Sequence, residues 1–261
     1  MLNEIEIYIL LFFSYSFLGW IIEVTAKFIQ YKRFINRGFL IGPICPIYGY
    51  GALLISLLLK KYLSDPLAMF LFAMVICSIL EYLTSYFMEK IFHARWWDYS
   101  TKKYNINGRI CLDTMIPFGL LGILMMYLIN PFLINIFSKF SFTLITSICS
   151  FFIVLYIVDN VLSLIGLIMI KNDIDLYDKD NTEEISLKIK NVLFNKNWKE
   201  KRIIKSFPDV KFINKNLKEK ISKIEDKIEK KQIKLRLERD EKIKRLKESY
   251  DEKIKKLKIK K

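Results

Sequence analysis

The chain has 261 residues, of which 52% are hydrophobic and 15% aromatic, yet it carries a formal net charge of +15. The two properties are separated along the chain, because residues 1–170 carry a net charge of +3 and residues 171–261 carry +12. A single compact soluble domain and a disulfide-rich secreted scaffold are therefore excluded. The sequence predicts a transmembrane helical domain over residues 1–170 and a basic cytoplasmic helical tail over residues 171–261.

The apolar part contains several runs long enough to cross a bilayer, which takes about 20 mostly apolar residues in a helix. They predict five transmembrane helices, so the expected fold class is all-α, a polytopic helical membrane bundle. The spans are expected over residues 5–27, 39–60, 66–89, 113–138 and 140–170. The last span is longer than a bilayer requires, so we expect it to tilt or to continue into the cytoplasm.

Basic residues in the connections set the expected orientation. The connections after the first and third spans are rich in Lys and Arg, whereas the other two hold only Lys60 and Lys61, or Lys139. We therefore expect a multi-pass protein of the cell (inner, cytoplasmic) membrane, with its N-terminus outside and its C-terminus in the cytoplasm. Glu4 and Glu6 stand where a cleavable signal peptide carries basic residues, so the first span is expected to be retained.

The second span contains residues that disfavour a regular helix. Residues 38–51 hold four of the nine glycines and two of the six prolines, so we expect this helix to be broken or kinked. Two interpretations fit. Freed backbone groups line a substrate path, or small residues allow tight helix packing.

The second and fourth spans share a short pattern. Its members are Asn36, Pro46 and Gly51 in one, and Asn107, Pro117 and Gly122 at the same distances in the other. The preceding spans carry Glu23 and Glu81. The pattern indicates a parallel repeat of the helix hairpins 5–60 and 66–138, and a chance match is the alternative.

Acidic residues recur inside or beside the predicted spans, at Glu23, Glu81, Glu89, Asp113 and Asp159. An ionisable side chain at membrane depth costs about 2.5–3.5 kcal/mol on insertion scales, so it normally faces the bundle interior with a partner. The partners in the two basic connections are Arg37, His93, Arg95 and Arg109. Two interpretations fit: structural ion pairs that lock helices to loops, or a polar cytoplasmic-side site for an ion or a charged headgroup.

The connection between the third and fourth spans has an unusual composition, with Trp96 and Trp97 between Arg95 and Asp98. Trp favours the headgroup level of a bilayer, so an interfacial anchor is one interpretation and a docked functional loop is the other. The candidate binding residues form a polar cytoplasmic-side cluster: Glu23, Arg37, Glu81, Glu89, His93, Arg95, Trp96, Trp97, Asp98, Tyr99, Asn107 and Arg109.

No metal or cofactor site is expected. The four cysteines lie more than thirty residues apart, no CxxC occurs, and His93 is the only histidine. Zinc and haem sites need ligands at closer spacing, so the cysteines are interpreted as small apolar packing residues.

A series of motifs in this order resembles a known family. The motifs are Gly19, Trp20 and Glu23; residues 36–43 and 46–49; residues 81–85 with Glu89; residues 96–100; and residues 107–109. Over about residues 12–125 the chain resembles the ABC-transporter type IV (CmpB-like) membrane family. The resemblance implies a bacterial multi-pass inner-membrane protein connected with transport. The chain departs from the family pattern after Arg109, where Cys111, Asp113 and Phe118 stand near an expected Ser and Trp-Gly pair.

The basic tail has a helical pattern. Apolar residues recur at intervals of three and four from Val210, with a four-residue slip near Arg239. This predicts a coiled-coil helix with one stutter from about residue 210, through which the chain self-associates or binds a partner. A solvated charged helix attracted to anionic lipid is the alternative. No nucleic-acid-binding motif occurs, so no specific nucleic-acid partner is expected.

Together these features favour a permease-like membrane subunit of a transport system, and not an enzyme. No GxxxxGK[ST] motif occurs, so a separate nucleotide-binding ATPase subunit, docked on the 90–110 loop or the tail, would hydrolyse ATP. One alternative is a membrane scaffold or regulator that acts through the tail. Another is an intramembrane enzyme on a phosphorylated lipid, with Glu81, Glu89 or Asp98 as acid or base and Arg95 and Arg109 on the phosphate.

Overall fold

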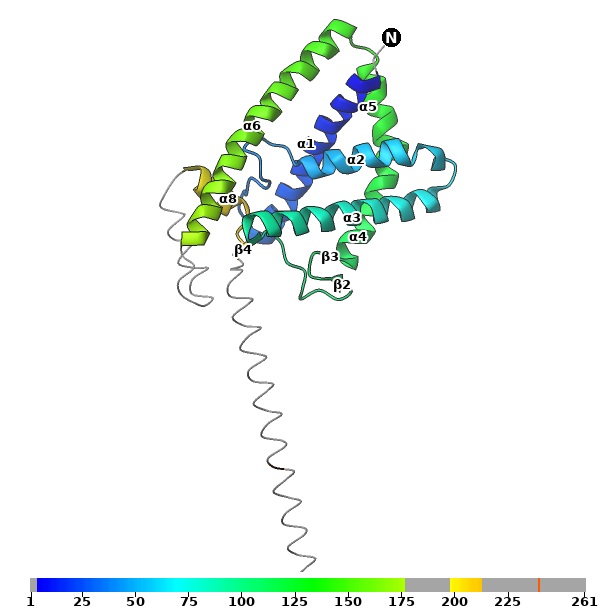
Figure 1. The fold of residues 1–261 in the computed structure, drawn as a ribbon. Helices are drawn as coiled ribbons and strands as arrows, with labels where there is room; N and C mark the ends of the chain where they lie inside the picture. The colour runs from blue at the N-terminus through cyan, green and yellow to red at the C-terminus, as the bar shows by residue number, and fades with distance from the viewer. Residues whose placement is uncertain (1–3, 177–197, 213–238, 240–261) are drawn as a thin grey trace, which may run out of the picture. The chain divides into compact units, whose positions relative to one another are not determined.

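The computed structural model describes residues 4–176, 198–212 and 239 (Figure 1). The chain divides into two units, Met1–Ile213 and Asn214–Lys261, and Arg239 is the described residue of the second. All other described residues belong to the first unit. The coiled coil predicted from about residue 210 therefore lies almost entirely outside the described residues and stays a prediction.

The first unit is built from helices joined by turns and four short strands. The helical elements are α1 (Glu4–Tyr31), α2 (Pro46–Leu58), the 3-10 turn η1 (Lys60–Tyr62), α3 (Pro66–Phe92), α4 (Leu112–Leu124), the π-helical turn η2 (Met125–Ile129), α5 (Asn130–Phe137), α6 (Phe142–Leu176) and α8 (Trp198–Ser206). The strands are β1 (Ala94–Arg95), β2 (Asn105–Ile106), β3 (Ile110–Cys111) and β4 (Lys211–Phe212). β1 pairs antiparallel with β4, and β2 with β3.

Four of the described helical segments are long and apolar enough to cross a membrane: α1, α3, the continuous segment Leu112–Phe137 through α4, η2 and α5, and Phe142–Asn172 within α6. Large apolar side chains such as Leu128, Phe151 and Val154 point outward on these segments. An extensive apolar surface of this kind is stable against lipid tails but not against water. The predicted class, a helical membrane protein, is confirmed.

The structure corrects the predicted span over residues 39–60. Helix α2 begins only at Pro46 and has 13 residues. It therefore reaches about 20 Å, short of the roughly 30 Å of a hydrocarbon core. Residues 38–45 are not helical, because Gly38 has a φ of +126° and Pro43 lacks the N–H that a helix requires. The count of five spans was wrong for the described residues, whereas the predicted break in this helix is confirmed.

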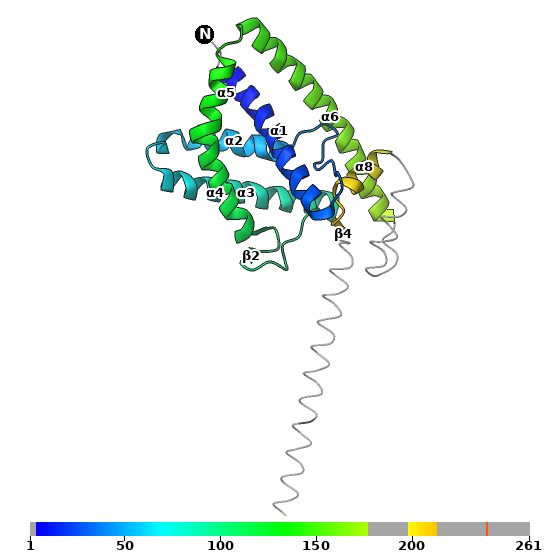
Figure 2. The ribbon, with the colours of Figure 1, turned by 180° about the vertical axis from the view of Figure 1, so that it is seen from behind.

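Helices α2 and α3 lie side by side, and the α4–α5 segment runs across them (Figures 1 and 2). Helix α6 begins near the start of α1, where the Cys149 thiol donates to the Glu6 carbonyl oxygen at 3.7 Å. Its other end lies beside α8. Thus the 93–111 loop, α8 and the end of α6 gather at the end of the unit opposite the α5–α6 turn.

Two apolar cores hold the unit together. The larger core joins α1, α2, α3, the α4–α5 segment and α6 around fully buried side chains such as Leu11, Met69 and Ile145. The second core joins the end of α3, β1, α6 and α8, with Trp96 and Ile203 among its members. Residues 198–210 are therefore packed onto the membrane helices by buried apolar area.

Glycines bring two helix pairs unusually close. A methyl group added at Gly49 of α2 would lie 2.7 Å from the carbonyl oxygen of Phe12 in α1. One added at Gly119 of α4 would lie 2.9 Å from the carbonyl oxygen of Phe70 in α3. Phe12 precedes Glu23 by the same interval as Phe70 precedes Glu81. Matching contacts of this kind are what a repeat of the two hairpins would produce, and the repeat stays a prediction.

Candidate functional site

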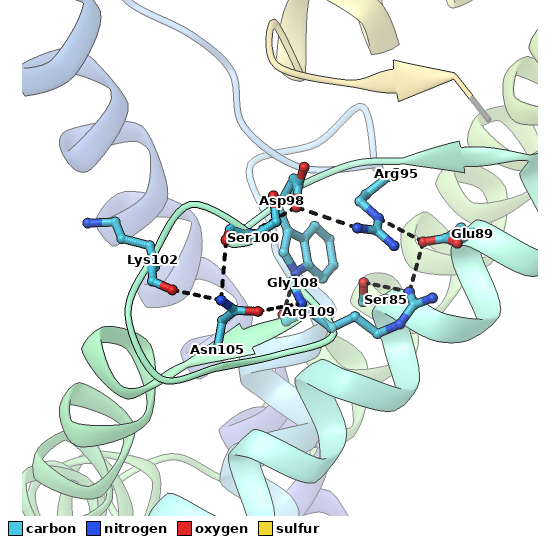
Figure 3. A network of polar contacts seen from close by, with 10 residues as sticks. Ser85, Glu89, Arg95, Asp98, Ser100, Lys102, Asn105, Gly108 and Arg109 are labelled. Carbon is cyan, nitrogen blue, oxygen red and sulfur yellow. Dashed lines mark hydrogen bonds and ion pairs between the residues drawn. The ribbon is translucent and has the colours of Figure 1, made fainter. Parts of the chain in front are cut away.

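Glu89, near the end of α3, is the centre of a buried ion-pair network (Figure 3). Its Oε2 atom lies 2.8 Å from Arg95 Nε and 3.0 Å from Arg109 Nη1. The side chains of Glu89 and Arg109 are only 12% and 9% exposed. Arg109 also donates to the Ser85 hydroxyl at 3.2 Å, one turn back along α3. The network fixes both ends of the 93–111 loop against α3.

Two carboxylates stabilise the charged form of Arg95. Burial acts to lower the pKa of Arg95, but the hydrogen bond and charge of Glu89, together with Asp98, outweigh burial and raise the pKa. Arg95 also approaches Asp98 Oδ1 at 3.5 Å. A positive charge held between two carboxylates in this way positions a loop, because each partner is a charge-assisted hydrogen-bond acceptor.

The 93–111 loop is also folded by hydrogen bonds of its own (Figure 3). Asp98 Oδ1 accepts the Ser100 backbone N–H at 3.0 Å, and the Asn105 amide donates to the Lys102 carbonyl at 2.7 Å while accepting the Gly108 N–H at 3.0 Å. Gly108 has a φ of +66°, and a side chain there would meet Asp98 Oδ1 at 2.8 Å. These hydrogen bonds link Asp98 to Ser100 and Asn105 to Lys102 and Gly108, and so stabilise the fold of the loop.

The two adjacent tryptophans face the protein. Trp96 is 3% exposed and packs edge-on against the rings of Phe39 and Phe207, at centroid distances of 4.8 and 5.1 Å. The Trp97 indole N–H donates to the Arg109 carbonyl at 3.2 Å. Both rings thus help to seat the 93–111 loop on its neighbours.

Glu23 in α1 and Glu81 in α3 have partners of different kinds. Glu23 accepts from Arg37 Nε at 3.3 Å and from the Tyr48 hydroxyl at 2.9 Å. Glu81 accepts from the Tyr99 hydroxyl at 3.3 Å and lies 3.5 Å from Thr114 Oγ1. Burial, followed by the negative charges of Glu81 and Glu23, raises the pKa of Tyr99.

The non-helical residues before α2 are held from both sides by charged side chains. Asp159 of α6 accepts the backbone N–H groups of Ile41 and Gly42, each at 2.7 Å. Arg202 of α8 donates to the Phe39 carbonyl at 2.7 Å, and burial lowers the pKa of this guanidinium. Irregular backbone at membrane depth requires partners of this kind from the protein.

The predicted site residues fall into two groups. Glu89 of α3 and the loop residues Arg95, Trp97, Asp98 and Arg109 form one network, whereas in the second group Glu23 pairs with Arg37 and Glu81 accepts from Tyr99. Trp96 is in the second core, His93 ends α3 with a φ of +51°, and Asn107 donates to the Tyr82 hydroxyl at 2.9 Å. Asp113, predicted near the membrane, is 66% exposed and pairs with Lys102.

The sequence did not single out Tyr48, Thr114 or Arg202 for the site. Tyr48 lies in the 46–49 motif but is not charged, and neither the Thr114 hydroxyl nor a tail arginine belongs to a motif. The apolar residues of the 198–210 segment, Ile203, Ile204, Phe207 and Val210, recur at helical spacing and are the signal that could have placed it against the membrane helices.

The fold and the buried polar groups define a multi-pass membrane protein with a structured loop between α3 and α4. A family model described as "Putative ABC-transporter type IV" matches residues 10–164, more than half of the chain. The chain belongs to this family, as the sequence motifs indicated. No curated protein and no solved structure matches the chain.

Proposed function

We propose that the chain is the membrane subunit of an ABC-type transport system and that a separate nucleotide-binding ATPase drives it. Family membership over residues 10–164 and four helices able to cross a membrane support this role. The absence of a GxxxxGK[ST] motif from the sequence makes a second subunit necessary for ATP hydrolysis.

The 93–111 loop carries the proposal, because it combines a fixed base with an exposed apolar tip. Tyr104 and Ile106 at the tip are 79% and 50% exposed, and Lys102 and Lys103 beside them are also exposed. Tyr104 has a φ of +52°, a backbone conformation that the surrounding turn has to hold. An exposed aromatic residue on a rigid loop is a typical anchor of a protein–protein interface.

The lipid-phosphate enzyme receives less support from the geometry. Arg95 and Arg109, the residues expected to hold phosphate, are both occupied by Glu89. Asp98, a candidate acid or base, accepts the Ser100 N–H and neighbours Arg95. These groups act on the loop itself, so the proposal includes no enzymatic step.

Purification of the tagged chain from its native membrane in mild detergent tests the proposal. A protein with a GxxxxGK[ST] motif should co-purify with the wild type and be lost from a Tyr104→Ala, Ile106→Ala double variant. Phe34→Ala is the matched control, because Phe34 is an exposed aromatic residue in the other predicted cytoplasmic connection. Recovery of no ATP-binding protein with the wild type contradicts the proposal, as does equal loss from the control.

A further inference from the structure

Glu23 and Glu81 occupy matching places in the α1–α2 and α3–α4 hairpins but differ in their surroundings. The Glu23 side chain is 32% exposed and pairs with Arg37. Glu81 is 9% exposed, and no basic side chain among the described residues pairs with it. Glu81 also lies well inside α3, about 16 Å along the helix axis from its end at Phe92.

The arginine that could neutralise Glu81 is bound elsewhere. Glu81, Ser85 and Glu89 are four residues apart and share one face of α3. Arg109 reaches this face but contacts Ser85 at 3.2 Å and Glu89 at 3.0 Å. Its counter-ion is therefore Glu89, and within the described part of the chain Glu81 has hydroxyl partners only.

The hydroxyl groups around Glu81 match a carboxylic acid better than a carboxylate. Thr114 has one hydroxyl proton, and its better acceptor is the Cys111 carbonyl at 2.9 Å. Glu81 Oε2 is the longer of its two acceptors, at 3.5 Å. With the hydroxyl proton on the Cys111 carbonyl, Thr114 Oγ1 is left to accept from a protonated Glu81. Tyr99 donates to Glu81 Oε1 at 3.3 Å. A protonated Glu81 accepts from Tyr99 and donates to Thr114, so each of these groups has a hydrogen-bond partner. With the Thr114 proton on the Cys111 carbonyl, an ionised Glu81 has two buried oxygens and, among residues 4–176 and 198–212, the single donor Tyr99.

We propose that Glu81 is a proton-binding site at the junction of the two hairpins, with the proton on Oε2 at neutral pH and directed to Thr114 Oγ1. The titratable groups that face Glu81 are Glu23 of α1, Tyr48 of α2, Cys77 of α3 and Tyr99 of the 93–111 loop. Each is neutral or acidic, so none compensates a negative charge on Glu81. Glu23 adds repulsion that its pair with Arg37 only partly offsets.

Protonation of Glu81 gives the proposed transport subunit a group that can take up and release one proton where the hairpins meet. Buried carboxylic acids within membrane helices serve as proton relays in pumps and transporters. The use of this proton in transport rests on the proposed function, whereas the protonation itself is a property of the isolated chain.

Infrared spectroscopy of the purified full-length chain at neutral pH tests the proposal directly. The wild type should show the C=O stretch of a protonated carboxylic acid, shifted in D₂O, and Glu81→Gln should abolish it. Glu23→Gln is the control and should retain it, because Glu23 is paired with Arg37. Absence of the band from the wild type, or its persistence in Glu81→Gln, overturns the proposal.

A second variant keeps the test decisive should Glu81→Gln fail to fold. Thr114→Val preserves the side-chain volume but removes the acceptor for the acid proton of Glu81. Because the acid O–H then loses its hydrogen bond, the C=O band of Glu81 should move to higher frequency. An unshifted band contradicts the proposed site. Failure to find an ATPase would leave these spectra unchanged, so the two proposals can fail separately.

Discussion

The buried ion-pair network at Glu89 makes a quantitative prediction about stability. Glu89→Gln removes a carboxylate that lies 2.8 Å from Arg95 and 3.0 Å from Arg109. Arg95 keeps Asp98 at 3.5 Å, but the 9%-exposed side chain of Arg109 loses its counter-ion. Removing one partner of a buried pair costs about 3–5 kcal/mol, because the remaining charge stays buried and uncompensated.

An exposed pair between the same loop and α4 supplies the matched control. Asp113→Asn removes the carboxylate that pairs with Lys102 at 3.2 Å, where the two side chains are 66% and 55% exposed. Solvent screens such a pair, which is worth about 0.2–1 kcal/mol. Both variants convert one acid to its amide and both act on the 93–111 loop, so burial is the difference between them.

Thermal unfolding of the detergent-solubilised chain measures the contrast. Since about 1 kcal/mol shifts the Tm of a domain of this size by about 2–4 °C, Glu89→Gln should lower the Tm by about 6–20 °C and Asp113→Asn by no more than about 4 °C. Equal shifts for the two variants would show that the Glu89 network does not hold the loop, and would refute its role as a rigid docking element.

Three further predictions concern helix packing, the segment before α2 and pH. Gly119→Ala should destabilise the α3–α4 contact by about 1–3 kcal/mol in chemical unfolding, because the added methyl meets the Phe70 carbonyl, whereas Gly51→Ala, whose nearest neighbour is 3.5 Å away, should be tolerated. Asp159→Ala should leave two backbone N–H groups without an acceptor, at a cost in stability of about 1–3 kcal/mol each, whereas Asp159→Asn keeps one acceptor oxygen and should cost less. Protease cleavage within residues 38–45 should be faster in Asp159→Ala than in Asp159→Asn. The reverse order would refute the role of Asp159 in holding this segment. Burial acts to raise the pKa of Asp209, but the hydrogen bond from Tyr31 and the charge of Lys27 outweigh burial and lower the pKa below its ordinary value. The stability that Asp209 contributes is therefore present above the ordinary aspartate pKa and is lost as the pH falls through the lowered value. Asp209→Asn should remove this loss of stability at acid pH, measured as unfolding against pH.

The membrane class could be predicted from the sequence because it depends on uninterrupted apolar runs, a property of neighbouring residues. The break before α2 could be predicted as well, since Gly38 and Pro43 act on their own backbone. The length of α2 could not. Residues 39–45 are apolar enough to extend a membrane span, and the contacts of Asp159 and Arg202 that hold them in a non-helical conformation come from distant segments.

The candidate site was predicted as a set of residue types but not as a set of pairs. The sequence placed acids and arginines on the same side, and the structure joins Glu23 to Arg37 and Glu89 to both Arg95 and Arg109. The hydroxyl partners of Glu81 depend on how α4 crosses α3, which no local pattern encodes. This distribution of partners distinguishes a structural acid such as Glu89 from a candidate proton site.

Photo-crosslinking from residue 104 in native membranes gives the decisive test of the proposed function, because it reports which molecule the loop tip touches. With a photoreactive amino acid in place of Tyr104, we expect a crosslinked protein that carries a GxxxxGK[ST] motif. The same probe in place of Phe34 should not capture it. Crosslinks from residue 104 to lipid alone, or only to proteins without that motif, would contradict the assignment of this chain as an ATPase-driven transport subunit.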